Sequence, residues 1–398
     1  MTLSSGDIVC PEKKLLVLCA RTRMQPSIAE EIRQLAKRPL DWGFLLSEAA
    51  QNSVVPLLTR HLASVAQDIV PAEHIARLKD AARANAARCL ALTAELIQIA
   101  ELLNVARIRA IPYKGPVLAV QAYGDVALRE FEDLDIVHRQ RDVAKANQIV
   151  TGLGYRAIFP QLFDRNGAGT LVPGDYGYRD DARGLMIELH TERTLRHFPR
   201  PPDLDDLSTR LAPVTLSGHD LLTFAPEDML PILCIHGAKH FWERISWIAD
   251  IAEFVQSLPG LDWDAVCRRA ERLQALRMLH LGLDLASNLL AAPLPAEVLS
   301  RVRADRVASS VALEVERRLM SREWPPLGAA QRFQFRRRML EGVLIGWKYS
   351  LRLATVPSEE DGAMMRLPRP LAPLYIALRP FRLLRKYGLR PKDPARHL

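Results

Sequence analysis

The chain has 398 residues and a formal net charge of +8, and 48% of its residues are hydrophobic and 25% charged. These values describe a globular protein long enough for two or three domains with hydrophobic cores. Five scattered cysteines without a C-x-x-C pair argue against a disulfide framework and a zinc knuckle, and they favour a cytoplasmic location. No apolar run approaches the ~20 residues that a helix needs to span a bilayer.

The positive charge is concentrated at the C-terminal end. Residues 331–398 contain 15 Lys and Arg against 5 Asp and Glu, so residues 1–330 are close to neutral. A protein that binds nucleic acid over its whole surface would be basic throughout. The distribution therefore indicates a near-neutral body with a basic end.

Residues 1–105 are predicted to form an N-terminal helical region. The apolar stretch 15–20 is expected to be a buried first helix. Pro56 and Pro71 interrupt the helical pattern. The long run 72–105 is rich in Ala, Arg, Leu and Glu, which are good helix formers.

Residues 106–222 are predicted to form a core built on a small sheet. Strands are expected to lead into the turn Lys114-Gly115 and to begin again at Asp133. A helix is then expected from 142 to 153, because Gly152 and Gly154 stand where glycines commonly end a helix. Two further strands, on either side of a turn that ends in Gly184, give a loose hairpin signal. A small mixed sheet with flanking helices results.

Residues 223–356 are predicted to form a C-terminal helical domain, followed by a basic, proline-rich tail over 357–398. Pro226 is followed by two acids, as is typical of the first turn of a helix. The prolines of the tail predict a linker with at most short helices. The expected fold class is α+β, with a small mixed-sheet core between two helical regions.

Two acids in the strand that begins at Asp133 carry the strongest chemical signal. Side chains alternate along a strand, so Asp133 and Asp135 point the same way. Neighbouring carboxylates repel unless a cation lies between them, and Mg²⁺ is usually held by one or two carboxylates plus substrate phosphates. A pair of acids at a solvated strand end would look the same. The same alternation places Glu188 and His190 on one face of a later strand.

The chain also carries an ordered set of motifs: Lys114-Gly115, Tyr123, Arg129, Asp133 to Val137, Gly154-Tyr155, Ile187 to His190, and a helical segment with His236, Lys239, His240, Trp242, Arg244, Trp247 and Asp250. This set resembles the uncharacterised bacterial nucleotidyltransferase family of the polymerase-β-like superfamily, over most of the chain from about residue 15 to 387. It departs from the superfamily pattern at the phosphate-binding turn, where Lys-Gly stands in place of Gly-Ser.

The resemblance implies an enzyme that moves a nucleoside monophosphate from an NTP to an acceptor hydroxyl or phosphate and releases pyrophosphate. Asp133, Asp135 and Glu188 would be the catalytic residues and the ligands of Mg²⁺ or Mn²⁺. An ordinary acid on a strand face is the alternative for Glu188. The acceptor is left open between a small molecule, a protein and an RNA.

Three residues near these acids are candidates for nucleotide binding. Lys114 would contact a phosphate, and Gly115 would let the backbone approach and donate its N–H. The alternative for Lys114 is a turn lysine in solvent. Arg129 would balance the carboxylates or bind the triphosphate, and an ion pair with Glu132 or Asp133 is an equal alternative.

A second group lies on the segment 236–250, which is expected to be one helix. His236, His240, Glu243, Trp247 and Asp250 follow helical spacing and would form one polar stripe. Such a stripe on an apolar helix is expected to face the carboxylates across a cleft. We therefore add Lys239, His240 and Arg244 to the nucleotide-binding candidates. A structural hydrogen-bond network is the alternative, whereas zinc is disfavoured because H-E-x-x-H is absent.

Other functions stay open. A chain with this fold could be a non-catalytic binding or accessory protein, or a nucleic-acid-binding protein that uses the basic tail. The tail could also contact an anionic membrane or a protein, because it interleaves apolar and basic residues. A terminal helix docked on the body, with its basic face in solvent, is the alternative for the tail.

Overall fold

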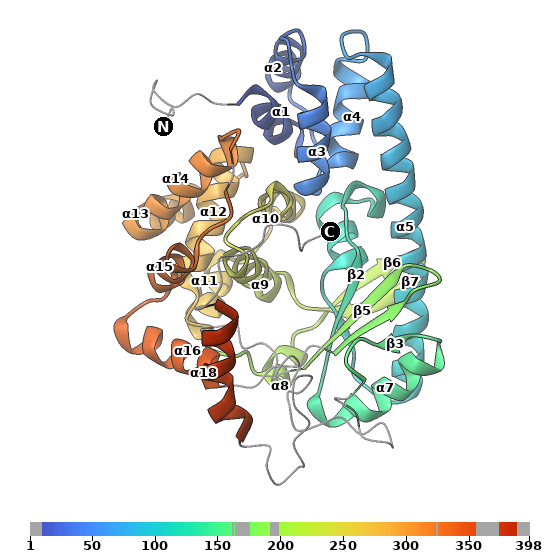
Figure 1. Cartoon of the computed structure of the whole chain (residues 1–398), viewed down its shortest axis with the longest axis vertical. Coiled ribbons are helices and arrows are strands. Elements are labelled where there is room, and N and C mark those ends of the chain that lie inside the picture. Colours follow the sequence, from blue (N-terminus) through green and yellow to red (C-terminus); the bar gives the residue numbers. More distant parts are fainter. Residues whose placement is uncertain are drawn as a thin grey trace.

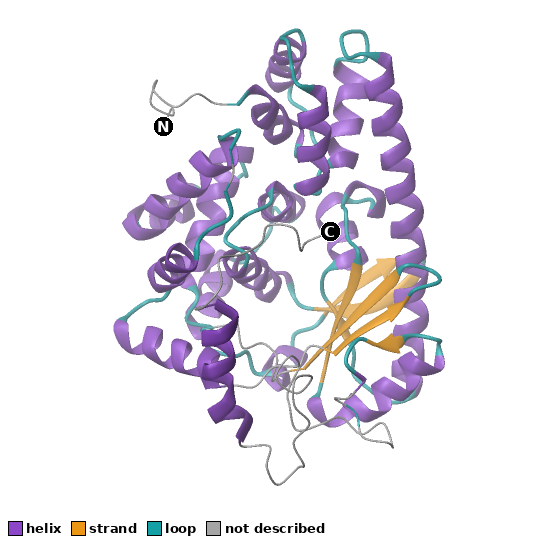
Figure 2. Cartoon of the chain, viewed as in Figure 1, coloured by secondary structure: helices purple, strands orange, loops and turns teal. Residues whose placement is uncertain are grey.

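Helices surround a small sheet in the computed structural model, which describes residues 10–160, 163, 176–191, 199–323, 325–355 and 374–387. The helix α5 (Ala72–Val105) runs along one edge of the molecule. The N-terminal helices pack beside its first half and the sheet beside its second half (Figure 1). The C-terminal helices form a separate layer on the other side of the sheet (Figure 2). The α+β fold class is therefore confirmed.

The N-terminal helices begin where the sequence provides helix-start signals. Before α5 come α1 (Pro11–Cys19), α2 (Pro26–Ala36), α3 (Trp42–Gln51) and α4 (Val55–Val65). Three of these have a proline in the first turn, and Asp41 caps α3 by accepting from the Phe44 N–H. Leu15 and Leu16 of α1 are completely buried. The helical assignment of this region and its buried first helix are confirmed.

The main sheet has five strands in the order β1-β2-β5-β4-β3. They are β1 (Ile111–Pro112), β2 (Asp133–His138), β3 (Arg156–Ala157), β4 (Tyr176–Asp180) and β5 (Leu185–Thr191). The central pair β2 and β5 is parallel and the other pairs are antiparallel, so the sheet is mixed, as expected. The helix α7 (Val143–Gly152) follows β2, and α5 and α7 cover one face of the sheet.

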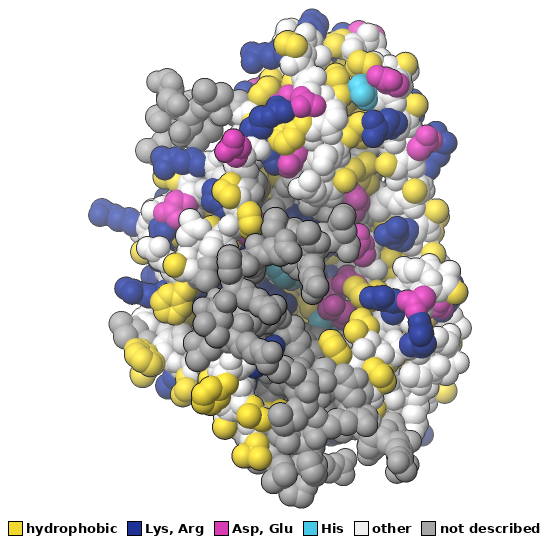
Figure 3. Space-filling model, viewed as in Figure 1, with side chains coloured by type: hydrophobic (Ala, Val, Ile, Leu, Met, Phe, Trp, Pro, Cys, Tyr) yellow, Lys and Arg dark blue, Asp and Glu magenta, His cyan; other side chains and the backbone are white. Residues whose placement is uncertain are grey.

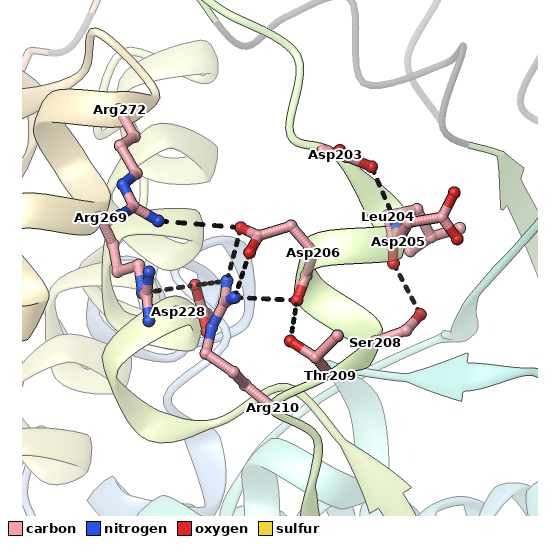
Figure 4. Close-up of polar contacts among 10 residues, drawn as sticks. All are labelled: Asp203, Leu204, Asp205, Asp206, Ser208, Thr209, Arg210, Asp228, Arg269 and Arg272. Atoms are coloured by element: carbon pink, nitrogen blue, oxygen red, sulfur yellow. Dashed lines mark hydrogen bonds and ion pairs between the residues drawn. The ribbon is translucent and has the colours of Figure 1, made fainter.

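A second hairpin joins the sheet to the C-terminal helices. It consists of β6 (Ala212–Leu216) and β7 (His219–Thr223), and the Thr223 hydroxyl donates to the Pro112 carbonyl of β1. The short helix α8 (Leu204–Ser208) precedes it. Arg210 forms ion pairs with Asp206 of α8 and with the buried Asp228, and Asp228 also pairs with Arg269 (Figure 4). These ion pairs hold the hairpin against the C-terminal layer.

The C-terminal layer consists of helices α9 to α16. Their bounds are α9 (Pro226–Lys239), α10 (Ile245–Ser257), α11 (Trp263–Arg272), α12 (Leu276–Leu290), α13 (Ala296–Ala304), α14 (Arg306–Met320), α15 (Ala329–Met339) and α16 (Val343–Thr355). The prediction of one helix over 236–250 is wrong, because the chain breaks between α9 and α10. Phe241 and Trp242 have φ of 58° and 52°, a left-handed conformation that a helix cannot continue through.

The described part of the tail is a helix, α18 (Leu374–Tyr387). The prediction of at most short helices there is wrong for these fourteen residues. A proline is tolerated within α18, at Pro380, and the helix packs beside α16 with Tyr375 buried. The part of the predicted linker over 357–373 and the end of the tail after 387 lie outside the described residues. Among the helices that the structure describes, none is long and apolar enough to cross a membrane.

Candidate active site

The parallel pairing of β2 with β5 brings the polar side chains of both strands onto one face of the sheet. In this register Asp135 lies opposite Glu188, and Val137 lies opposite His190. The intervening apolar side chains of both strands turn to the other face, where they are buried against α5 and α7. Val137 packs in the apolar cluster that includes side chains of α9 and α10. The carboxylate face of the sheet therefore looks toward the C-terminal helices.

Asp135 is the centre of this face. Its Oδ1 accepts from Lys114 Nζ at 2.9 Å and from His190 Nε2 at 2.8 Å. Burial alone would raise the pKa of Asp135, but the charge of Lys114 and the hydrogen bond from His190 outweigh it and hold that pKa far below its usual range. The pKa of Lys114 is raised because the charge of Asp135 outweighs its burial. Asp135 and Lys114 are therefore both charged at neutral pH.

Glu188 and His190 form a close group with Asp135, whereas Asp133 does not belong to it. One ligand atom each of Asp135, Glu188 and His190 lies within 4.8 Å of the others, and His190 Nε2 is 3.6 Å from Glu188 Oε2. Asp133 sits one step earlier on the same strand face and lies outside this close group. Burial and the negative charge of Asp135 both raise the pKa of Asp133. Within the described residues, the close group thus holds His190 where a third carboxylate was expected.

His190 was not among the predicted site residues, although a signal for it was present. It lies two residues after Glu188 on a strand, so the alternation that selected Glu188 also selects His190. Its ring nitrogen is aimed at Asp135. The resulting donor set, two carboxylates and one imidazole, fits a divalent cation. Oxygen ligands suit both Mg²⁺ and Mn²⁺, and the imidazole is better matched to Mn²⁺ than to Mg²⁺.

The turn before α6 (Gly115–Leu118) delivers Lys114 to the carboxylates. Gly115 has φ of +52°, and a Cβ there would lie 3.3 Å from the backbone oxygen of Asp133, so glycine is required on both counts. The Lys114 side chain is 13% exposed and paired with Asp135. Lys114 is therefore not a turn lysine in solvent.

Arg129 forms its ion pair with Asp250 and not with Glu132 or Asp133. Its Nε and Nη2 donate to the two oxygens of Asp250 at 2.8 and 3.0 Å, and the Tyr123 hydroxyl donates to the same carboxylate at 2.8 Å. Arg129 is buried, yet the charge of Asp250 outweighs that burial and raises the arginine pKa. This bidentate pair joins the segment before β2 to α10.

The α9–α10 junction places two neutral histidines near the carboxylates. The rings of His236 and His240 lie 4.8 Å apart, and both contact the ring of Trp247. Burial lowers the pKa of His236 well below its usual range, and burial with the charge of Lys239 lowers the pKa of His240 to about 3. The positive charge of Lys114 also lowers both pKa values, so both rings lie within range of that charge.

The two remaining candidates of this segment point elsewhere. Lys239 lines a small pocket together with Arg336 and Phe335 of α15. Arg244 is exposed, contacts the hydroxyl of Ser53 and lies over the ring of Trp247. These contacts are with α15, Ser53 and Trp247, whereas the charge of Lys114 acts on His240.

Comparison with known proteins identifies a family and a related solved structure. The model of a family described as "Uncharacterised nucleotidyltransferase" matches residues 38–291, more than half of the chain. The chain is similar to a crystal structure of an antigenic nucleotidyltransferase-like protein from Paracoccidioides brasiliensis, with 16% sequence identity and a TM-score of 0.33. That similarity covers 52% of this chain and 96% of the other. No curated protein matches the sequence.

Proposed function

The chain belongs to the uncharacterised nucleotidyltransferase family, and on that basis we propose that it moves a nucleoside monophosphate from an NTP to an acceptor and releases pyrophosphate. The observation that carries the proposal is the group of Asp135, Glu188 and His190 on two parallel strands, beside the Lys114 turn. Such a group supplies both the divalent-cation ligands and a positive charge for a triphosphate.

Asp133, Asp135 and Glu188 are proposed to hold Mg²⁺ or Mn²⁺, with His190 as a further ligand or as the group that orients Asp135. The bound cation would offset the negative charge that develops on the phosphates. Asp135 is ionised and pre-positioned by two hydrogen bonds, so it needs no reorganisation to act as a ligand. Glu188 is the member best placed to accept a proton from an acceptor hydroxyl, because its side chain is 35% exposed.

Lys114 and Gly115 are proposed to contact the NTP phosphates. Lys114 is charged, and its ammonium lies at the carboxylate face, where phosphates bound through a cation would be found. Arg129 is proposed to add positive potential while Asp250 holds it in place. His240, with Lys239 and Arg244 farther out, is proposed to contact the remainder of the nucleotide. The uncharged imidazole of His240 suits a base or sugar better than a phosphate.

A labelling experiment tests this function. The purified chain is incubated with each α-labelled NTP and Mn²⁺ or Mg²⁺, together with small-molecule, protein and RNA fractions of a cell extract. We expect one fraction to become labelled with wild type and no fraction with Asp135→Asn. Asp80→Asn, an exposed acid on α5, is the matched control and should behave as wild type.

A second candidate function is a nucleotide-binding protein without turnover. It is favoured by one observation, namely that Asp135 already has two hydrogen-bond donors that compensate its charge. Thermal melts combined with the labelling experiment separate the two functions. Mn²⁺ with NTP should raise the melting temperature of wild type in both cases, but only the enzyme labels an acceptor. If wild type shows neither response, both functions are wrong.

A further inference from the structure

Large apolar side chains are exposed in one region of the molecule, distant in sequence from the carboxylate site. Of fourteen large hydrophobic side chains that are exposed among the described residues, eight lie on α15, α16 and α18. We call these eight the C-terminal apolar face: Phe333, Leu344, Trp347, Leu351, Leu374, Ile376, Leu378 and Phe381. Figure 3 shows hydrophobic side chains gathered over these helices, with Lys and Arg side chains among them. Such a concentration marks an interaction surface.

The exposed residues follow helical spacing. Leu344, Trp347 and Leu351 form a stripe along α16 at i, i+3 and i+7. A second stripe runs along α18 through Leu374 and Phe381 with Leu378 between them. An apolar stripe of this kind normally packs against a core. Here both helices are docked through other side chains, since Tyr349 and Tyr375 are buried while Trp347 and Phe381 are 73% and 72% exposed.

The same helices carry charge of one sign. Within their bounds α15, α16 and α18 contain ten Lys and Arg and no Asp or Glu. Arg337 and Lys348 are exposed, and Arg336, Arg352 and Arg382 are partly exposed. Long basic side chains beside an apolar stripe can reach outward to anionic groups while the stripe is covered.

We propose that the C-terminal apolar face binds the surface of an anionic lipid bilayer. The apolar stripes would enter the boundary between headgroups and acyl chains, and the flanking basic side chains would bind lipid phosphates. This is attachment in the plane of the membrane, and it requires no helix that spans the bilayer. The face contains none of the carboxylate-site residues, so it would localise the reaction without contributing to the chemistry.

Other occupants fit these observations less well. A second copy of the chain, pairing by two-fold symmetry, would bring the exposed basic side chains of one copy against those of the other, which is unfavourable. A nucleic acid would satisfy the arginines but would leave the leucine and isoleucine side chains in contact with phosphate and water. Only a bilayer offers anionic groups and an apolar phase together over the area of three helices.

Vesicle flotation with the full-length chain tests the proposal. Vesicles of phosphatidylcholine alone are compared with vesicles that also contain phosphatidylglycerol. We expect wild type to float with the anionic vesicles, to stay behind with the neutral ones, and to be released as the salt concentration rises. Trp347→Ser with Phe381→Ser should weaken binding by about tenfold or more. Arg337→Gln with Lys348→Gln should weaken it by about thirtyfold through the loss of two charges.

The matched control is Leu90→Ser with Val105→Ser, which removes two exposed apolar side chains from α5 and should leave flotation unchanged. All variants alter exposed positions, so their melting temperatures should stay at the wild-type value. The proposal is overturned if wild type ignores anionic vesicles, or if the Trp347 and Phe381 variant floats as the control does. It is also overturned if wild type is a dimer in sedimentation and the Trp347 and Phe381 variant becomes a monomer without any change in flotation. Tighter binding of the wild-type chain to RNA than to the vesicles would overturn it as well.

Discussion

Among single residues, Glu130 caps a helix that is distant in sequence, and its carboxyl has a raised pKa. Val54 at the start of α4 offers no side-chain cap, and the Val55 N–H donates instead to Glu130 Oε1 at 2.8 Å. Burial raises the pKa of Glu130 to about 7, and the negative charge of Glu132 adds to this, although the Val55 N–H opposes it. The helix is thus capped by a carboxyl that is partly protonated near neutrality.

The raised pKa of Glu130 predicts a loss of stability as the pH rises. The ordinary pKa of 4.5 applies to the unfolded chain, so between about 4.5 and 7 the folded state binds more protons. The free energy of unfolding should therefore fall across this window and level off above it. Glu130→Gln keeps the acceptor oxygen and removes the titration. We expect it to match wild type near pH 4.5 and to exceed it by about 1–2 kcal/mol at pH 8, a value reduced for partial exposure.

Urea denaturation of both proteins at the two pH values measures this difference. Glu130→Ala is the companion variant, because it loses the acceptor as well and should be less stable than Glu130→Gln at both values. A gap between wild type and Glu130→Gln that does not change with pH would show that the carboxyl does not titrate as described.

Among the elements, the break between α9 and α10 depends on two glycines in neighbouring helices. Trp242 follows α9 in a left-handed conformation and folds back, fully buried, over Gly237 of α9. A Cβ at Gly237 would lie 2.5 Å from the indole ring, and one at Gly282 of α12 would lie 3.0 Å from it. The glycines weaken their helices but allow the indole to pack between them. This packing holds α10, and with it Asp250, close to α9.

Gly237→Ala is predicted to destabilise the protein although alanine favours helix. The gain in helix propensity is about 1 kcal/mol, but the new methyl group overlaps the Trp242 ring, and overpacking typically costs about 1–3 kcal/mol or more. Because the indole is enclosed and cannot move aside, we expect a net loss of about 1–2 kcal/mol and a lower melting temperature. Gly152→Ala in α7 is the control, since a Cβ there meets nothing within 4 Å and stability should be unchanged or higher. Equal melting temperatures for the two variants would contradict the packing argument.

At the scale of the whole molecule, a buried ion pair connects the segment before β2 to the C-terminal layer. Asp250 of α10 accepts from Arg129 and Tyr123, which come from the segment between the Lys114 turn and β2. The side chains of Arg129 and Asp250 are 11% and 5% exposed. A buried pair of this kind contributes little net stability, but removing one partner leaves the other charged and unpaired. The relative placement of the carboxylate face and of α10 therefore depends on both residues.

Asp250→Asn is expected to lower the free energy of unfolding by about 3–5 kcal/mol, because it leaves the buried guanidinium of Arg129 without a counter-charge. Arg129→Met combined with Asp250→Asn should recover part of this loss, and the difference measures the coupling between the two side chains. Asp264→Asn removes an exposed ion pair with Arg301 and should change stability by less than about 1 kcal/mol. Additive losses in the double variant would mean that the pair does not act as a unit.

Local patterns in the sequence by themselves determined the helical regions, the α+β class and the shared strand faces. The alternation along a strand does not depend on which strands pair with it, so it assigns Asp133 with Asp135, and Glu188 with His190, to common faces. The helix-start prolines and acids likewise act within one turn of chain. The ordered motifs also predicted the nucleotidyltransferase family, although they did not assign a role to His190.

Only the tertiary structure decided which of these residues meet. His190 meets Asp135 because β2 and β5 pair in parallel register, and Lys114 meets it because the turn after β1 lies beside β2. Register between strands so far apart in the chain is not encoded in any one strand alone. Arg129 pairs with Asp250 rather than with its neighbours Glu132 or Asp133 because α10 is brought beside it. The helix break at Trp242 follows from packing between two glycines, which overrides the helical periodicity that continues through the segment.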